Sequence, residues 1–143
     1  MPENSKTNEP IVQTVWVDCP VDEAFRFFTE GIAEWWPHAE RCAIEPWLGG
    51  SIFEPSPDGR DKEWGTIIAW EPPGLLEFTW YPRRQEDREE TVRVEFEVEA
   101  DGTRVTLIHR GWNRAPEWNA GLRCFATAAR GRVAQAFLPV SGL

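Results

Sequence analysis

The chain has 143 residues, of which 41% are hydrophobic, and this size fits one compact domain and leaves no room for a second. Its 24 acidic residues outnumber its 15 basic ones, and the net charge of −9 argues against binding to nucleic acid or to an anionic membrane surface. No run of about 18 apolar residues occurs, and the N-terminus lacks a basic segment followed by an apolar stretch, so a soluble cytoplasmic protein is expected.

The cysteine and aromatic contents narrow the possible sites. Cys19, Cys42 and Cys124 are odd in number and never form a CxxC spacing, which predicts buried free thiols rather than a disulfide framework or a zinc ribbon. No metal and no cofactor is expected. Nine Trp and eight Phe residues supply large, rigid side chains that can build the walls of a cavity.

The first elements in chain order are a strand and a helix. Residues 1–10 are polar and predict a flexible leader ahead of a single domain spanning residues 11–143. The β-branched and aromatic residues 11–17 are typical of a strand. A helix should follow, with Pro20 at its first position and Gly31 at its C-terminal cap. Its apolar residues recur at helical spacing and are Val21, Ala24, Phe25 and Phe28.

Two adjacent tryptophans come next, in the stretch AEWWPHAE at residues 33–40. Neighbouring side chains on a helix point about 100° apart, so Trp35 and Trp36 are not expected to face one core together. We expect Trp35 to be the more buried indole and Trp36 to line the mouth of a cavity. Pro37 limits this second helix to a short turn, and His38 is interpreted as a solvated loop histidine rather than a ligand.

Strands and turns alternate from residue 42 onwards. The separators PDGRD, EPPG, RRQEDREE and ADG delimit strands predicted at residues 42–47, 51–55, 64–70, 75–81, 91–99 and 103–110. Hairpin-length connections between them favour an antiparallel sheet. The clearest alternation places one set of apolar residues on the core face, namely Val92, Val94, Phe96 and Val98. The charged segment RRQEDREE, residues 83–90, is interpreted as a solvated hairpin loop.

Helical spacing returns in residues 116–137. Arg123, Arg130 and Gln135 lie off a stripe of apolar residues that is long enough to cross the sheet. Because many residues of this helix are Ala or Gly, it can either pack closely on the sheet or leave a gap. The stripe consists of Trp118, Leu122, Phe125, Ala129, Val133 and Phe137.

Five motifs stand in a characteristic order along the chain: CPVDEAFRFFTE, AEWWP, LGGSIFE, WGTIIAWEPPGLLEFTW and GTRVTLIHRGW. Together with the predicted order of elements, they resemble the START-like or SRPBCC helix-grip superfamily, and within it the branch related to the activator of Hsp90 ATPase. The resemblance spans residues 12–137. It implies an α+β fold of the START/Bet v 1-like type, in which a curved antiparallel sheet grips the long C-terminal helix, often around an apolar cavity.

The candidate ligand contacts are the aromatic residues expected near that cavity and one histidine. His109 shares strand parity with Val105 and Leu107, which puts it on the apolar face. There it can be satisfied by a core hydrogen bond, contact a ligand or act in catalysis. No catalytic residue is assigned, because no second titratable group is identified beside it. The full set is Trp36, Trp47, Phe53, Trp80, Phe96, His109 and Phe125.

Three functions therefore stay open. The preferred one is a binding module for a small apolar or aromatic molecule between the sheet and the C-terminal helix. The alternatives are a domain that interacts with a chaperone or regulator, and an enzyme of cyclase or hydrolase type that uses His109 and a carboxylate. The superfamily includes all three kinds, so the fold alone does not choose among them.

Overall fold

The computed structural model describes residues 9–36, 42–80, 90–111, 118 and 120–129. Several expectations concern residues outside these ranges: most of the leader, His38, most of the charged segment 83–90, and the helix beyond residue 129. None of the three cysteines forms a disulfide, and Cys19 and Cys42 are buried whereas Cys124 is half-buried. Burial is thus confirmed for two of the three.

The described strands form one antiparallel sheet in the order β1-β7-β6-β5-β4-β3-β2. The predicted antiparallel architecture is confirmed. The strands are β1 (Ile11–Val17), β2 (Ala43–Ile44), β3 (Ser51–Glu54), β4 (Lys62–Glu71), β5 (Leu75–Thr79), β6 (Thr91–Glu99) and β7 (Gly102–Arg110).

The predicted second strand, residues 42–47, is wrong in its extent. β2 ends at Ile44 because Pro46 has no N–H to donate and the chain turns directly after it. In that turn the Gly50 N–H donates to the Trp47 carbonyl at 2.9 Å. Gly49 has a φ of 85°, a conformation that glycine adopts without strain.

Two short helices follow β1, and the first begins one residue later than predicted. α1 (Val21–Thr29) has Pro20 as its N-cap, since Pro20 is extended and its carbonyl accepts the Ala24 N–H at 2.8 Å. Glu30 rather than Gly31 is the C-cap. Gly31 begins the turn into α2 (Ile32–Trp35), where a β-carbon would lie 2.7 Å from the Phe27 ring.

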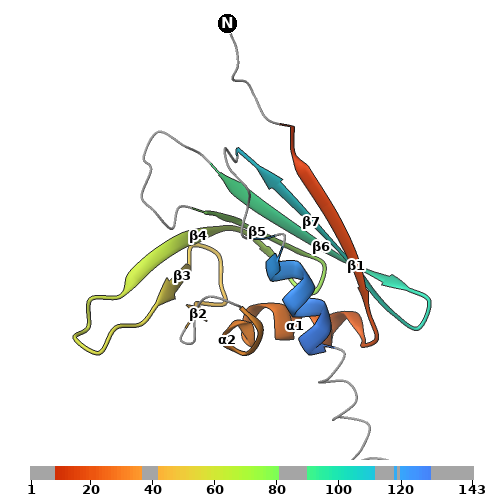
Figure 1. The fold of residues 1–143 in the computed structure, drawn as a ribbon, viewed down its shortest axis with the longest axis horizontal. Helices are drawn as coiled ribbons and strands as arrows, with labels where there is room; N and C mark the ends of the chain where they lie inside the picture. Colours follow the sequence, from red (N-terminus) through yellow and green to blue (C-terminus); the bar gives the residue numbers. More distant parts are fainter. Residues whose placement is uncertain (1–8, 37–41, 81–89, 112–117, 119, 130–143) are drawn as a thin grey trace, which may run out of the picture.

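The helices that the structure describes lie on one side of the curved sheet (Figure 1). They are α1, α2 and the C-terminal helix, which the structure describes at Trp118 and residues 120–129. This arrangement is the helix-grip fold. The sheet face beneath the helices is called the core face, and the opposite face is called the outer face. Phe25 of α1 joins the two layers, with its ring 5.1 Å from those of Phe96 and Trp70.

The alternation predicted for β6 holds over most of the strand but fails at its end. Val92, Val94 and Phe96 are buried on the core face, whereas Val98 is 70% exposed. Val98 pairs with Thr103 close to the tip of the β6–β7 hairpin, where none of the described helices covers its side chain. Strand parity fixes the direction of a side chain, but burial also needs a partner above it.

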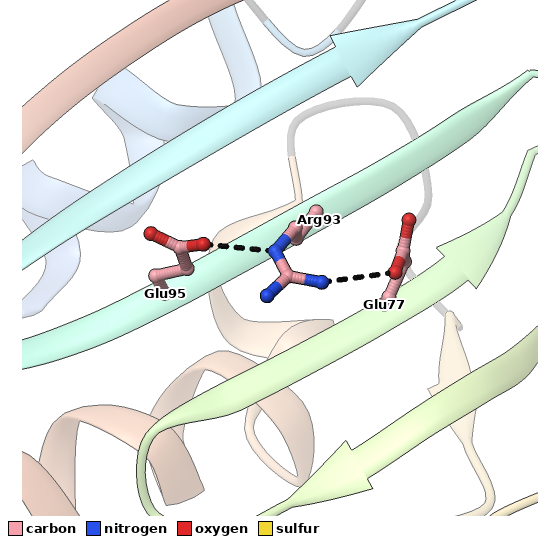
Figure 2. Close-up of polar contacts among 3 residues, drawn as sticks. All are labelled: Glu77, Arg93 and Glu95. Carbon is pink, nitrogen blue, oxygen red and sulfur yellow. Dashed lines mark hydrogen bonds and ion pairs between the residues drawn. The ribbon is translucent and has the colours of Figure 1, made fainter.

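Arg93 of β6 makes two ion pairs on the outer face, one with Glu77 of β5 and one with Glu95 of its own strand (Figure 2). Figure 2 shows Arg93 between Glu77 and Glu95, at distances of 3.3 and 2.8 Å. The hydrogen bond that Arg93 donates to Glu95 raises the pKa of Arg93, and the charge of Glu77 adds to this effect. The cross-strand contact of Arg93 with Glu77, its direct partner in the ladder, supports the β5–β6 register.

Candidate functional site

Trp35 and Trp36 are both buried, at 4% and 5% exposure, so the expectation that only one faces the core is wrong. The helical angle does not apply to this pair, because α2 ends at Trp35 and Trp36 is extended, with φ −68° and ψ 124°. The Trp35 indole N–H donates to the Phe27 carbonyl at 3.1 Å. The two indoles meet edge to face at 5.9 Å and both join the core.

Trp118, the first described residue of the C-terminal helix, lies at the centre of the aromatic core. It is almost fully buried. Its indole approaches rings of α1, α2 and β5, and also the rings of Trp36, directly after α2, and Trp80, directly after β5. We call this group the Trp118 cluster. The centroid distances from Trp118 are 4.5 Å to Trp36, 5.3 Å to Trp80, 5.6 Å to Phe78 and 6.0 Å to both Phe28 and Trp35.

The C-terminal helix approaches this cluster closely through a glycine. A β-carbon on Gly121 would lie 2.6 Å from the Trp36 ring and 3.2 Å from the Trp118 ring. The sequence left open whether this helix, rich in Ala and Gly, packs closely or leaves a gap. At Gly121 it packs closely. A cavity elsewhere between sheet and helix stays a prediction.

His109 is the histidine of the core face and is only 2% exposed. Its predicted position on the apolar side of the strand, with Val105 and Leu107, is thus confirmed. The imidazole Nε2 lies 3.0 Å from the Oε1 atom of Glu90. A carboxylate can only accept, so this contact favours a proton on Nε2 and leaves Nδ1 of the neutral ring as an acceptor.

Glu90 is a site residue that the sequence reasoning missed. It was included in the charged segment 83–90 and interpreted as part of a solvated loop. Its main chain instead continues the ladder, since the Trp80 N–H donates to the Glu90 carbonyl at 2.9 Å. The available signal was parity, because Glu90 precedes Val92 by two residues and such residues share one face of a strand.

The structure brings some of the predicted contact residues together and separates others. Trp36 and Trp80 pack within the Trp118 cluster at 5.6 Å. Phe96 and Phe125 are both buried and meet the same ring, that of Phe28, at 5.7 and 5.0 Å. Trp47 is 55% exposed and Phe53 is half-buried next to the buried Ile52, so neither is among the residues that pack on Trp118. Their roles as ligand contacts stay predictions.

Cys42, the residue before β2, carries a buried thiol. Burial raises the pKa of its thiol from 9.0 to about 12, and the nearby charge of Glu54 adds to the effect. The thiol is therefore protonated at neutral pH and is a poor nucleophile. No group of three or more His, Cys, Asp or Glu residues that could hold a metal ion occurs in the described part of the chain.

The geometry defines a helix-grip protein with an aromatic core face and a part-buried contact between the Glu90 carboxylate and the His109 imidazole. A family model described as activator of Hsp90 ATPase homolog 1-like protein matches residues 18–131. The chain belongs to this family. No helix in the described ranges is long and apolar enough to cross a membrane.

Similar solved structures support the same fold. Protein NE0264 from Nitrosomonas europaea is 16% identical, with a TM-score of 0.66 over 91% of this chain and 97% of that one. The Aha1 dimer from Colwellia psychrerythraea is 14% identical, with a TM-score of 0.65 over 85% and 96%. An anthrahydroquino-gamma-pyrone synthase, Txn09, complexed with SUM, is 28% identical, with a TM-score of 0.57 over 84% and 96%. Among curated proteins, no relative matches the chain.

Proposed function

We propose that the protein binds a small apolar or aromatic molecule between the core face of the sheet and the C-terminal helix. The observation that carries this proposal is the placement of His109 on the same face as the Trp118 cluster. Small-molecule sites typically combine apolar and aromatic lining with a few placed polar groups. The similarity to an anthrahydroquino-gamma-pyrone synthase complexed with SUM supports the same choice.

A fluorescence titration tests binding, because nine tryptophans report on molecules that enter an aromatic core. The probes are anthracene and 2-hydroxyanthraquinone, and the protein is compared with His109→Ala. We expect saturable quenching, with affinity for 2-hydroxyanthraquinone weakened by about 1 kcal/mol in the variant, the size of one lost hydrogen bond. Absence of saturable quenching by either probe would contradict the proposed function.

Proton transfer is a second candidate function, and the Glu90–His109 contact favours it. A carboxylate behind an imidazole fixes the tautomer and stabilises the imidazolium that forms when the ring accepts a proton. In this scheme a bound hydroxyl gives its proton to Nδ1 of His109 and is left as an oxyanion, while Nε2–H stays bonded to Glu90. The sequence alone identifies no second titratable group beside His109.

The visible absorbance of bound 2-hydroxyanthraquinone tests this second candidate, because its phenolate and phenol forms differ in colour. Wild-type protein should ionise the bound probe at a lower pH than free probe requires, and Glu90→Gln should remove much of that shift. Glu77→Gln is the matched control, since the Glu77 and Glu90 side chains are both 19% exposed and both contact a basic residue. Equal ionisation of free and bound probe would exclude proton transfer to His109.

A further inference from the structure

Three polar side-chain atoms are buried and have no hydrogen-bond partner among the described residues. They are Oε1 of Gln13, Nδ1 of His109 and Nε1 of Trp118. Buried polar groups in native proteins nearly always have a partner, so each such atom requires an explanation. Ordered water or a ligand can supply the missing partner.

Strand register places Gln13 and His109 next to each other on the core face. Gln13 of β1 pairs with Leu107 of β7, and its neighbour Ile11 pairs with His109. Gln13 is therefore the diagonal neighbour of His109, within reach of a long side chain. Gln13 also shares parity with the buried Val17, which puts it on the core face.

Trp118 approaches the same region from above the sheet. Its indole lies 5.6 Å from the ring of Phe78, which pairs with Val92, and Val92 in turn pairs with His109. Phe78 and His109 are thus two strand spacings apart, or roughly 10 Å. This span corresponds to about the length of two or three fused aromatic rings.

The three atoms differ in what they can bond. Trp118 Nε1–H can only donate, whereas the amide oxygen of Gln13 can only accept. His109 Nδ1 accepts when Nε2 donates its proton to Glu90. The region therefore offers one donor and two acceptors at separate places on an aromatic surface.

We propose that Gln13, His109 and Trp118 form the polar contacts of a site for a planar, fused-ring aromatic molecule that carries both a hydroxyl and a carbonyl group. This inference rests on the proposed binding function and specifies its ligand class. The ligand hydroxyl donates to His109 Nδ1, with Gln13 Oε1 as the second acceptor beside it. The ligand carbonyl accepts the indole N–H of Trp118.

Three matched probes test the hydrogen bonds separately: 2-hydroxyanthraquinone has both groups, anthraquinone lacks the hydroxyl, and 2-hydroxyanthracene lacks the carbonyls. Dissociation constants are measured by calorimetry for the full chain, for His109→Phe, for Trp118→Phe and for Gln13→Leu. We expect wild-type protein to bind 2-hydroxyanthraquinone about tenfold more tightly than either other probe.

The variants should remove these preferences selectively. His109→Phe should abolish the preference over anthraquinone and keep the preference over 2-hydroxyanthracene, whereas Trp118→Phe should do the reverse. Gln13→Leu should reduce the preference over anthraquinone. Ratios between probes are compared within each variant, so a general loss of packing cancels.

The possible failures are distinguishable. If all three probes bind wild-type protein equally, the hydrogen-bonding inference is wrong while the proposed binding function stands. If none binds, both are wrong. If the preferences persist in the variants, or if a crystal structure of the 2-hydroxyanthraquinone complex shows waters on these three atoms, other groups recognise the ligand and the inference is overturned.

Discussion

Trp36 packs among other tryptophans because its backbone leaves helical geometry before the proline. Its ring contacts those of Trp35, Trp64, Trp80 and Trp118. We therefore expect Trp35→Ala and Trp36→Ala to lower the free energy of unfolding by similar amounts, about 3–5 kcal/mol each. Urea denaturation measures both. Trp47→Ala is the control at an exposed position and should change stability by less than about 0.5 kcal/mol. A loss below about 1 kcal/mol for Trp36→Ala would contradict its place in the core and favour a position at the mouth of a cavity.

Cys42 makes the free energy of unfolding depend on pH in the alkaline range. Because its folded-state pKa is raised from 9.0 to about 12, the folded protein retains a proton that the unfolded chain releases in between. The stability that this thiol contributes is full below about pH 9 and is lost as the pH rises towards 12, by up to about 1.4 kcal/mol per pH unit. Urea unfolding of wild type and Cys42→Ala at about pH 8 and about pH 10.5 measures the difference. The advantage of wild type should shrink with rising pH, and a constant advantage would exclude ionisation of Cys42 as the cause.

Single residues also show what the sequence could and could not predict about the candidate site. The face of His109 follows from strand parity alone, and it was predicted correctly. Glu90 was missed because the charged composition of segment 83–90 is typical of a solvated loop, although the parity of Glu90 with Val92 indicated the core face. The unpartnered atoms of Gln13 and Trp118 depend on what the rest of the fold places next to them, and a local pattern carries no such information.

At the scale of elements, the C-terminal helix is positioned by Gly121. Replacing glycine by alanine inside a helix normally stabilises the helix by about 1 kcal/mol, because alanine has the higher helix propensity. Here the added β-carbon would meet Trp36 at 2.6 Å and Trp118 at 3.2 Å, so we expect Gly121→Ala to lower stability instead. Thermal unfolding measures the sign of the change. Thr127→Ala, at an exposed position of the same helix, gains propensity without a clash and should be neutral or stabilising. A stabilising Gly121→Ala would mean that the helix does not press on Trp36 as described.

Strand limits were predictable where they depend on local chemistry and not where they depend on neighbours. β1 and β6 begin and end where alternation and turn residues indicated. β4 runs from Lys62 to Glu71, longer than the predicted residues 64–70, because its ends pair with Glu54 and Leu75 on the adjacent strands. Non-local pairing therefore set the limits of β4, which the local pattern did not indicate. β2 is shorter than predicted for a local reason, because Pro46 interrupts its pairing.

At the scale of the whole molecule, the two faces of the sheet carry glutamates in comparable settings with different expected roles. Glu77 contacts Arg93 on the outer face, and Glu90 contacts His109 on the core face. Both pairs join neighbouring parts of the sheet, so both contribute to stability. The proposed site gives only Glu90 a role in ligand binding, because only His109 faces the Trp118 cluster across the core.

Ligand-induced stabilisation distinguishes these roles. A ligand that binds only the folded protein raises its stability by about 2.7 kcal/mol at roughly 100 times the dissociation constant. With 2-hydroxyanthraquinone at that concentration, we expect this full gain in the wild type and in Glu77→Gln, measured as the difference in unfolding free energy with and without probe. In Glu90→Gln the neutral amide can donate to Nε2 and leave the proton on Nδ1, which removes the acceptor that the ligand hydroxyl needs. The gain should therefore fall by about 1 kcal/mol in that variant at the same probe concentration. Equal gains in the two glutamine variants would show that Glu90 supports the sheet but does not orient His109 for binding.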